Sequence, residues 1–116
     1  MVNNEYIPNR GDIIWITFDP RKGREQRGRR PALVLSVRMY NQRSGLALVC
    51  PVTSHQKGYP FEVALQEKNV KGAVLTDHVH SFDWKKRKAV FIEKINAEVL
   101  EQVLNKIIVL ITNQTK

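Results

Sequence analysis

The sequence has one cysteine, no long apolar run and few acidic residues. Cys50 has no second cysteine to pair with, so an intrachain disulfide is excluded, and its place at the end of an apolar run favours a buried residue over a nucleophile. No wholly apolar run is longer than that from Ile107 to Ile111, far short of the roughly 20 residues of a membrane-spanning helix. The first residues lack the pattern of a secretion signal, so we expect a soluble, cytoplasmic protein with no membrane partner.

The shortage of acidic residues leaves a strong positive charge. The chain has 19 Lys and Arg residues against 11 Asp and Glu residues, a formal net charge of +8. The excess is concentrated, because residues 21–43 hold eight basic side chains against Glu25, and residues 85–88 are all basic. Such clusters favour a polyanion as partner, although a basic run can also be a solvated surface.

Two segments place polar side chains where predicted strands begin or end. Gly23 to Ser36 is a glycine-punctuated, arginine-rich loop that leads into an apolar strand, and Pro51 to Ser54 ends another strand. Pro31 forces Arg30 into an extended backbone, and a guanidinium can donate two parallel hydrogen bonds to a phosphate. Because a group with a pKa above ~12 is a poor base, Arg30 is interpreted first as a group for charge stabilisation and proton delivery.

The other polar groups of these segments fit the same chemistry. The hydroxyls of Thr53 and Ser54 could contact a phosphate oxygen or a ribose hydroxyl, although two adjacent hydroxyls most often form an ordinary turn. Glu25 could accept a proton, orient Arg30 or act as a structural counter-ion. With no carboxylate or His/Cys cluster beside them, these groups favour a phosphodiester that is handled without a metal.

Histidines and aromatic residues allow further interpretations. His78 and His80 would share one face of a strand, but only Asp77 or His55 could add a third ligand, so we expect no metal and no cofactor. Contact with RNA through a histidine, or a plain surface role, fits better than a histidine mechanism. Aromatic residues near the basic segments could stack on unpaired bases of single-stranded RNA or pack in the core: Tyr40, Tyr59, Phe61, Phe82 and Trp84.

Short apolar runs separated by turn signals predict six strands, a pattern typical of a small antiparallel, SH3-like barrel. The predicted strands are Asp12 to Phe18, Ala32 to Val37, Leu46 to Val52, Phe61 to Leu65, Gly72 to His80 and Ala89 to Ile95. The spacing of the second and third suits a hairpin. After Asn96, a suitable N-cap, apolar residues from Val99 to Ile111 predict an amphipathic helix that closes the barrel. The expected fold is mainly β (α+β), as one domain over residues 1–116.

Five segments resemble, in order and spacing, those of the MazF/PemK toxin family. They are Arg10 to Trp15, Phe18 to Pro20, Gly23 to Gln26, Gly28 to Ser36 and Pro51 to Ser54. The similarity continues through Lys57 to Val63 and Gly72 to Val79, which resemble the later part of the chromosomal MazF proteins, and it covers nearly the whole chain. The resemblance implies a PemK-like barrel capped by helices, working as a homodimer.

The resemblance also implies an activity. It indicates the toxin of a type II toxin-antitoxin module, an endoribonuclease that cuts single-stranded RNA at short sequences without ribosomes or metal. In this family the ribose 2′-hydroxyl attacks the adjacent phosphorus and leaves 2′,3′-cyclic phosphate and 5′-hydroxyl ends. Because the substrate supplies the nucleophile, the enzyme has to position groups, stabilise charge and transfer protons. A MazE-like antitoxin would lay an acidic, disordered tail across the basic surface.

Site residues follow from the matched positions. Arg30 corresponds to the family's catalytic arginine, Thr53 to its catalytic threonine and Glu25 to an acidic residue implicated beside them. The expected RNA-binding residues are Arg24, Gln26, Arg27, Arg29, Ser54, Lys57, Tyr59, Phe61 and His80. Arg29 stands where relatives often carry histidine, and Ser54 where some have a second threonine. Such departures would alter base preference more than chemistry.

Two alternatives stay open at this stage. A CcdB-like toxin of the same superfamily poisons DNA gyrase by protein contact and has no nuclease activity. Those proteins rely on a Trp-Gly-Ile carboxyl end, whereas this sequence has Thr112 to Lys116 there. A small barrel could also bind RNA without cutting it, an alternative that the match at Arg30 and Thr53 argues against.

Overall fold

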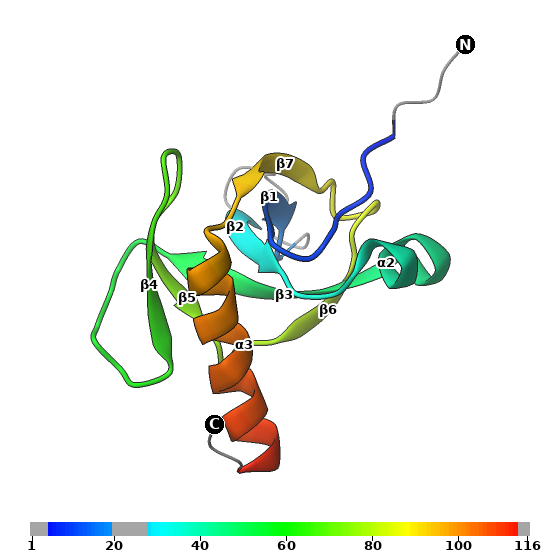
Figure 1. The fold of residues 1–116 in the computed structure, drawn as a ribbon. Coiled ribbons are helices and arrows are strands. Elements are labelled where there is room, and N and C mark those ends of the chain that lie inside the picture. The colour runs from blue at the N-terminus through cyan, green and yellow to red at the C-terminus, as the bar shows by residue number, and fades with distance from the viewer. Residues whose placement is uncertain (1–4, 20–27, 114–116) are drawn as a thin grey trace.

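The computed structural model describes residues 5–19 and 28–113, which form a curled antiparallel sheet with helices on its outside (Figure 1). The strands are β1 (Asp12–Thr17), β2 (Arg29–Val34), β3 (Leu46–Thr53), β4 (Glu62–Gln66), β5 (Lys71–Leu75), β6 (His80–Asp83) and β7 (Val90–Lys94). The helices are α2 (Arg38–Ser44) and α3 (Ala97–Thr112). The predicted fold class, mainly β with a helix at the C-terminal end, is confirmed. Neither helix is long and apolar enough to cross a membrane.

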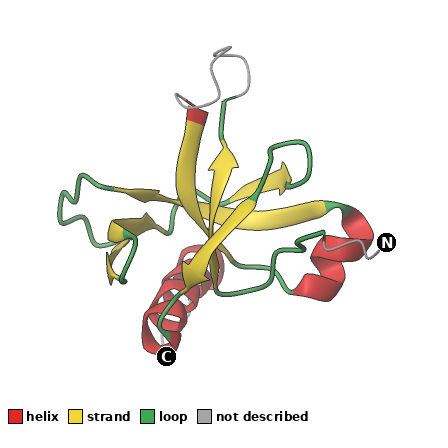
Figure 2. Ribbon diagram, turned by 90° about the horizontal axis from the view of Figure 1, so that it is seen from above, coloured by secondary structure: helices red, strands yellow, loops and turns green. Residues whose placement is uncertain are grey.

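Strand β3 connects the two parts of the sheet. The strand order is β4-β5-β3-β2-β1-β7, and β6 pairs with the first half of β3 while β5 pairs with its end. The curl seen in Figure 2 lets hydrophobic clusters form on both faces of the central strands. Leu33 and Cys50 belong to one cluster, whereas Ala32 and Val49 belong to the other. Strands buried on both faces read as continuous apolar runs, as these do.

Helix α3 covers the first of these clusters. Its partly buried apolar residues include Leu100, Leu104 and Ile107, and Val103 is fully buried. The side chain of Asn96 accepts a hydrogen bond from the backbone N–H of Glu98 at 2.8 Å, so the predicted N-cap is confirmed. The amphipathic pattern therefore predicted both the helix and the face that it buries.

The predicted hairpin between the second and third strands is wrong. β2 and β3 do pair, but α2 lies between them instead of a simple turn. The reason is Asn41, which is fully buried and donates from its amide to the carbonyl oxygens of Pro8 at 2.8 Å and Ser36 at 3.0 Å. This side chain ties the helix to the N-terminal segment, a long-range contact that local turn signals do not reveal.

The strand predicted from Gly72 to His80 is also wrong, because the structure divides it into β5 and β6. Buried Thr76 donates its hydroxyl hydrogen to the carbonyl oxygen of Phe61 at 2.6 Å. The backbone N–H of His78 then donates to the carbonyl oxygen of Leu75 at 3.2 Å, which closes a turn. His78 therefore lies in the turn and His80 begins β6, so the two histidines do not share one face of a strand.

Gly72 allows β5 to approach the end of β3. Its φ is +142°, and a Cβ at this position would lie 2.0 Å from the carbonyl oxygen of Thr53. The next residue, Ala73, is the register partner of Thr53. A glycine is therefore required both for the backbone conformation and for the close contact that fixes where β3 ends.

We expect Gly72→Ala to lower the free energy of unfolding by at least about 1–3 kcal/mol, because the variant combines a strained φ with a backbone overlap. Urea unfolding followed by circular dichroism measures the change. Gly45→Ala is the matched control: Gly45 also has a positive φ, +76°, but a Cβ there would meet no atom within 4 Å. An equal loss of stability in both variants would show that the contact with Thr53 has no effect.

Candidate active site at the ends of β2 and β3

Arg30 and Thr53 lie at the facing ends of two antiparallel strands. β2 and β3 are in the register Ala32↔Pro51, Leu33↔Cys50 and Val34↔Val49. Continued by two residues, this register places Arg30 opposite Thr53. Residues opposite one another in an antiparallel pair project to the same face of the sheet, so the guanidinium and the hydroxyl share a face. The structure thus brings together the two residues that the sequence analysis assigned to the chemistry.

Phe18 positions the guanidinium of Arg30. The carbon at the centre of the guanidinium lies 5.5 Å from the centroid of the Phe18 ring. The ring is held edge-on against His80 at 5.4 Å and against Phe82 at 5.0 Å. An aromatic face attracts a cation but accepts no conventional hydrogen bond, so this contact orients Arg30 without occupying its N–H groups.

His80 belongs to the surroundings of Arg30, whereas His78 does not. His80 is half-buried at the start of β6, and burial lowers its pKa, an effect that the nearby positive groups, including Arg30, reinforce. Both effects favour the neutral form of the imidazole. His78 is exposed and lies 3.6 Å from a carboxylate oxygen of Asp77. Within residues 5–19 and 28–113, no three His, Cys, Asp or Glu side chains gather as metal ligands would.

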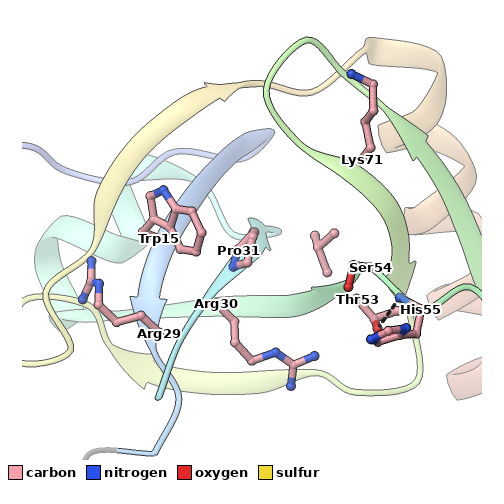
Figure 3. Close-up of a pocket in the computed structure, with 9 residues that line it drawn as sticks. Trp15, Arg29, Arg30, Pro31, Thr53, Ser54, His55 and Lys71 are labelled. Carbon is pink, nitrogen blue, oxygen red and sulfur yellow. Dashed lines mark hydrogen bonds between the residues drawn. The ribbon is translucent and has the colours of Figure 1, made fainter. Parts of the chain in front are cut away.

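Thr53 forms a turn and also lines the site. Its Oγ1 accepts a hydrogen bond from the backbone N–H of His55 at 3.1 Å, drawn as a dashed line in Figure 3. This bond uses a lone pair of the oxygen and leaves the hydroxyl hydrogen available to a ligand. Ser54 follows the end of β3 and is exposed. The sequence analysis treated an ordinary turn and a functional hydroxyl as alternatives. In the structure, the Thr53 hydroxyl is compatible with both roles.

A hollow of about 410 Å³ opens beside these strand ends (Figure 3). Its lining residues are Trp15, Arg29, Arg30, Pro31, Val52, Thr53, Ser54, His55 and Lys71. The sequence analysis did not select Trp15 or Lys71 as site residues. Trp15 lies in the apolar run from Ile13 to Ile16, so the sequence does not show that it is exposed. Lys71 could have been found from the adjacent Gly72, whose backbone packs on Thr53.

Arg29 projects away from Arg30 and is bound within the protein. Its guanidinium donates to the hydroxyl oxygen of Thr17 at 3.0 Å and to the carbonyl oxygen of Lys88 at 2.7 Å. Arg87 similarly donates to the carbonyl oxygens of Thr17 at 3.0 Å and Phe18 at 2.8 Å. The two arginines join the ends of β1 and β2 to the turn before β7. Arg29 thus has a structural role, and its contact with RNA stays a prediction.

Three predicted RNA-binding residues lie in the connection from β3 to β4. The rings of Tyr59 and Phe61 stack at a centroid distance of 5.3 Å, and Tyr59 is exposed. The carboxylate of Glu62 accepts a hydrogen bond from the backbone N–H of Lys57 at 3.0 Å. The ammonium group of Lys106 donates to the carbonyl oxygen of Pro60 at 2.6 Å, so α3 and β4 hold the connection in place.

The aromatic residues that the sequence analysis considered for stacking on RNA bases lie in different parts of the fold. Phe82 and Trp84 are core residues, and the indole N–H of Trp84 donates to the carbonyl oxygen of Asn41 at 2.9 Å. Tyr40 is exposed on α2, which joins the opposite ends of β2 and β3.

The prediction that Cys50 is buried is confirmed, and burial raises the pKa of its thiol to about 12. The candidates Arg24, Glu25, Gln26 and Arg27 lie outside the described residues.

Comparison with known proteins agrees with the resemblance stated from sequence. Residues 9–111 match the family model described as a PemK-like, MazF-like toxin of type II toxin-antitoxin systems. The chain is 46% identical to the endoribonuclease toxin MazF of Escherichia coli K12 over 93% of this chain and 97% of the relative. It is 41% identical to the E. coli K12 endoribonuclease toxin ChpB over 82% and 86% of the respective chains.

Solved structures show the same relationship. A crystal structure of MazF from Deinococcus radiodurans superposes with a TM-score of 0.84 at 48% identity, covering 92% of this chain and 98% of that one. A MazE-MazF crystal structure from the same organism gives a TM-score of 0.83 at 44% identity, covering 93% and 98%. The chain therefore belongs to the family of PemK-like, MazF-like toxins of type II toxin-antitoxin systems.

Proposed function

We propose that the protein is an endoribonuclease toxin that cuts single-stranded RNA. The observation that carries this proposal is the β2–β3 register, which sets the guanidinium of Arg30 and the hydroxyl of Thr53 on one face beside an open hollow. The net charge of +8 suits a polyanionic substrate. Relatives at 46% and 41% identity are named endoribonuclease toxins, and nothing favours a gyrase poison or a barrel that binds RNA without cutting it.

The proposed reaction is an internal transesterification. The 2′-oxygen of a ribose forms a bond to the adjacent phosphorus while the bond from phosphorus to the 5′-oxygen of the next nucleotide breaks. A base takes the proton of the 2′-hydroxyl, and an acid returns a proton to the departing 5′-oxygen. The products are a 2′,3′-cyclic phosphate and a 5′-hydroxyl. No metal and no external nucleophile are needed.

Arg30 and Thr53 act on the phosphorane. The permanently charged guanidinium stabilises the negative charge that develops on the non-bridging oxygens, and Phe18 keeps it oriented. The Thr53 hydroxyl donates to a phosphate oxygen while its own oxygen is held by the N–H of His55. Arg30 also delivers a proton toward the leaving oxygen. Glu25 is the proposed base for the 2′-hydroxyl.

The proposed partners follow from charge and family. A MazE-like antitoxin would inhibit the toxin by laying an acidic tail over the basic clusters at residues 21–43 and 85–88. Relatives from D. radiodurans crystallise as MazE-MazF assemblies. We further propose that residues 1–116 act as one domain, as a homodimer, in the cytoplasm.

Removal of either phosphate-binding side chain tests the site. Arg30→Ala and Thr53→Ala should each lower kcat by about 10²–10³-fold or more, because each removes a donor aimed at developing charge. Cleavage of a long single-stranded RNA, followed on gels under single-turnover conditions, measures the loss. Arg43→Ala, which removes an exposed arginine from the last turn of α2, is the matched control. Full activity in Arg30→Ala or Thr53→Ala would rule out the proposed roles.

A second experiment tests the reaction type. The protein should cut RNA at an undiminished rate in excess EDTA, and the products should carry 2′,3′-cyclic phosphate and 5′-hydroxyl ends. A single 2′-deoxy substitution on the 5′ side of a mapped cut site should abolish cleavage there, because it removes the nucleophile. Cleavage that stops in EDTA and returns with Mg²⁺, or that persists at the deoxy position, would contradict the mechanism.

The role of Glu25 is tested by its pH dependence. If its carboxylate accepts the 2′-hydroxyl proton, Glu25→Gln lowers kcat by about 10²–10⁴-fold and removes the acidic limb of the pH–rate profile. Arg24→Gln changes the neighbouring residue to the same side chain and should leave that limb in place. A Glu25→Gln profile with its acidic limb unchanged would show that the carboxylate orients other groups instead.

A further inference from the structure

Trp15 is a lining residue of the hollow that the proposed chemistry does not use. It lies in the middle of β1, where Ile14 and Ile16 on either side are fully buried, yet 43% of its surface is exposed. The other tryptophan, Trp84, is 7% exposed in the core. The register places Trp15 beside Pro31, and Figure 3 shows both on one side of the hollow. An indole ring is thus presented to solvent from a rigid strand.

The floor of the hollow is the outer end of a hydrophobic layer. Along β1, β2 and β3, the buried residues Ile13, Leu33 and Cys50 belong to the cluster that α3 covers. Side chains two positions apart on a strand point to the same face. Two positions closer to the site, β1, β2 and β3 therefore present Trp15, Pro31 and Val52 on the face of this cluster. Trp15 and Pro31 are no longer buried. The layer therefore ends in an apolar surface that is open to solvent and large enough to receive a flat ring.

The rim of the hollow carries positive charge. The cationic residues Lys71, Arg29 and Arg30 are among the lining residues, and no Asp or Glu of residues 5–19 and 28–113 is among them. Ser54 and His55 add polar groups at the side opposite Trp15 (Figure 3). An apolar, aromatic floor with a cationic rim fits a ligand that joins a flat ring to an anion. A nucleotide has this composition.

The hollow adjoins the pair assigned to the phosphate. Arg30 and Thr53 are themselves among its lining residues, although their side chains project to the opposite face of the strand ends from that of Trp15. A nucleic acid strand with a phosphodiester at Arg30 and Thr53 can therefore place a neighbouring base over the strand ends, against the indole. An acidic polypeptide can also pair with Arg30, but a nucleic acid joins a phosphodiester directly to a neighbouring base, so RNA is the occupant that the geometry favours.

We propose that the hollow is a base-binding subsite in which Trp15 stacks on an unpaired base next to the cleaved phosphodiester and Lys71 contacts the RNA backbone. The inference rests on the proposed function for the identity of its ligand. It adds a residue that binds substrate by stacking, without a part in bond breaking. Stacking accepts any base, so Trp15 contributes affinity more than sequence preference.

Tryptophan fluorescence tests the subsite without cleavage. The probe is a degenerate ten-nucleotide RNA with 2′-fluoro sugars, which lacks the nucleophilic hydroxyl and cannot be cut by transesterification. Saturating RNA should quench the emission of the wild-type protein, and the quenching should disappear in Trp15→Phe, which retains only the buried Trp84. Inorganic polyphosphate, which has the charge but no bases, should bind without quenching. Saturation is established separately by the anisotropy of labelled RNA.

Affinity gives the second readout. Trp15→Ala should weaken binding of the same RNA by roughly tenfold, the effect of losing one stacked base, and Trp15→Phe should recover most of the loss. Tyr40→Ala is the matched control, because Tyr40 is also 43% exposed but lies on α2. It should bind RNA as the wild-type protein does.

The outcomes separate this inference from the proposed function. The subsite is overturned if saturating RNA causes no quenching, or if Trp15→Ala and Tyr40→Ala bind RNA with equal affinity. Either result holds even if the protein cuts long RNA efficiently, and it leaves the hollow to a polypeptide partner. Quenching that depends on Trp15 supports the subsite. Failure to cut long RNA overturns the proposed function instead, and the fluorescence experiment does not depend on it.

Discussion

The hydrogen-bonded register between β2 and β3 is the constraint on which the candidate site depends. Continued by two residues from Ala32↔Pro51, it sets Arg30 opposite Thr53, and a shift by one residue would turn one of the two side chains to the opposite face. Pro31 keeps the approach to β2 extended, and Gly72 lets β5 hold the end of β3 in place. The two polar segments of the sequence therefore become one site because their backbones pair at Ala32 and Pro51.

The arginines of the basic region have different tasks. Arg29 and Arg87 donate to carbonyl oxygens and a hydroxyl at the ends of β1 and β2, so they hold the framework on which Arg30 stands. Arg30 packs on the ring of Phe18, which leaves its donors for an anion. Net charge explains the attraction of a polyanion, but hydrogen bonding decides which guanidinium can meet a phosphate.

Local patterns predicted the elements that depend on local physics. The α3 stripe and its Asn96 cap, the burial of Cys50 and the strand-end positions of Arg30 and Thr53 were all readable from sequence. Helix α2 and the break between β5 and β6 were missed, because each depends on a buried polar side chain whose partners are distant in sequence. Trp15 was missed because its strand is mostly buried on both faces. Such a strand lacks the alternation of apolar and polar residues that would mark an exposed position.

Coupling between Arg30 and Thr53 tests the central claim most directly. A double-mutant cycle compares kcat/KM for RNA cleavage in Arg30→Ala, Thr53→Ala and the double variant, relative to the wild-type protein. If the register makes these side chains one phosphate-binding unit, the double variant should be about as slow as the slower single variant, because residues that act together are not additive. Losses that multiply fully in the double variant would show two independent contributions and would contradict the account.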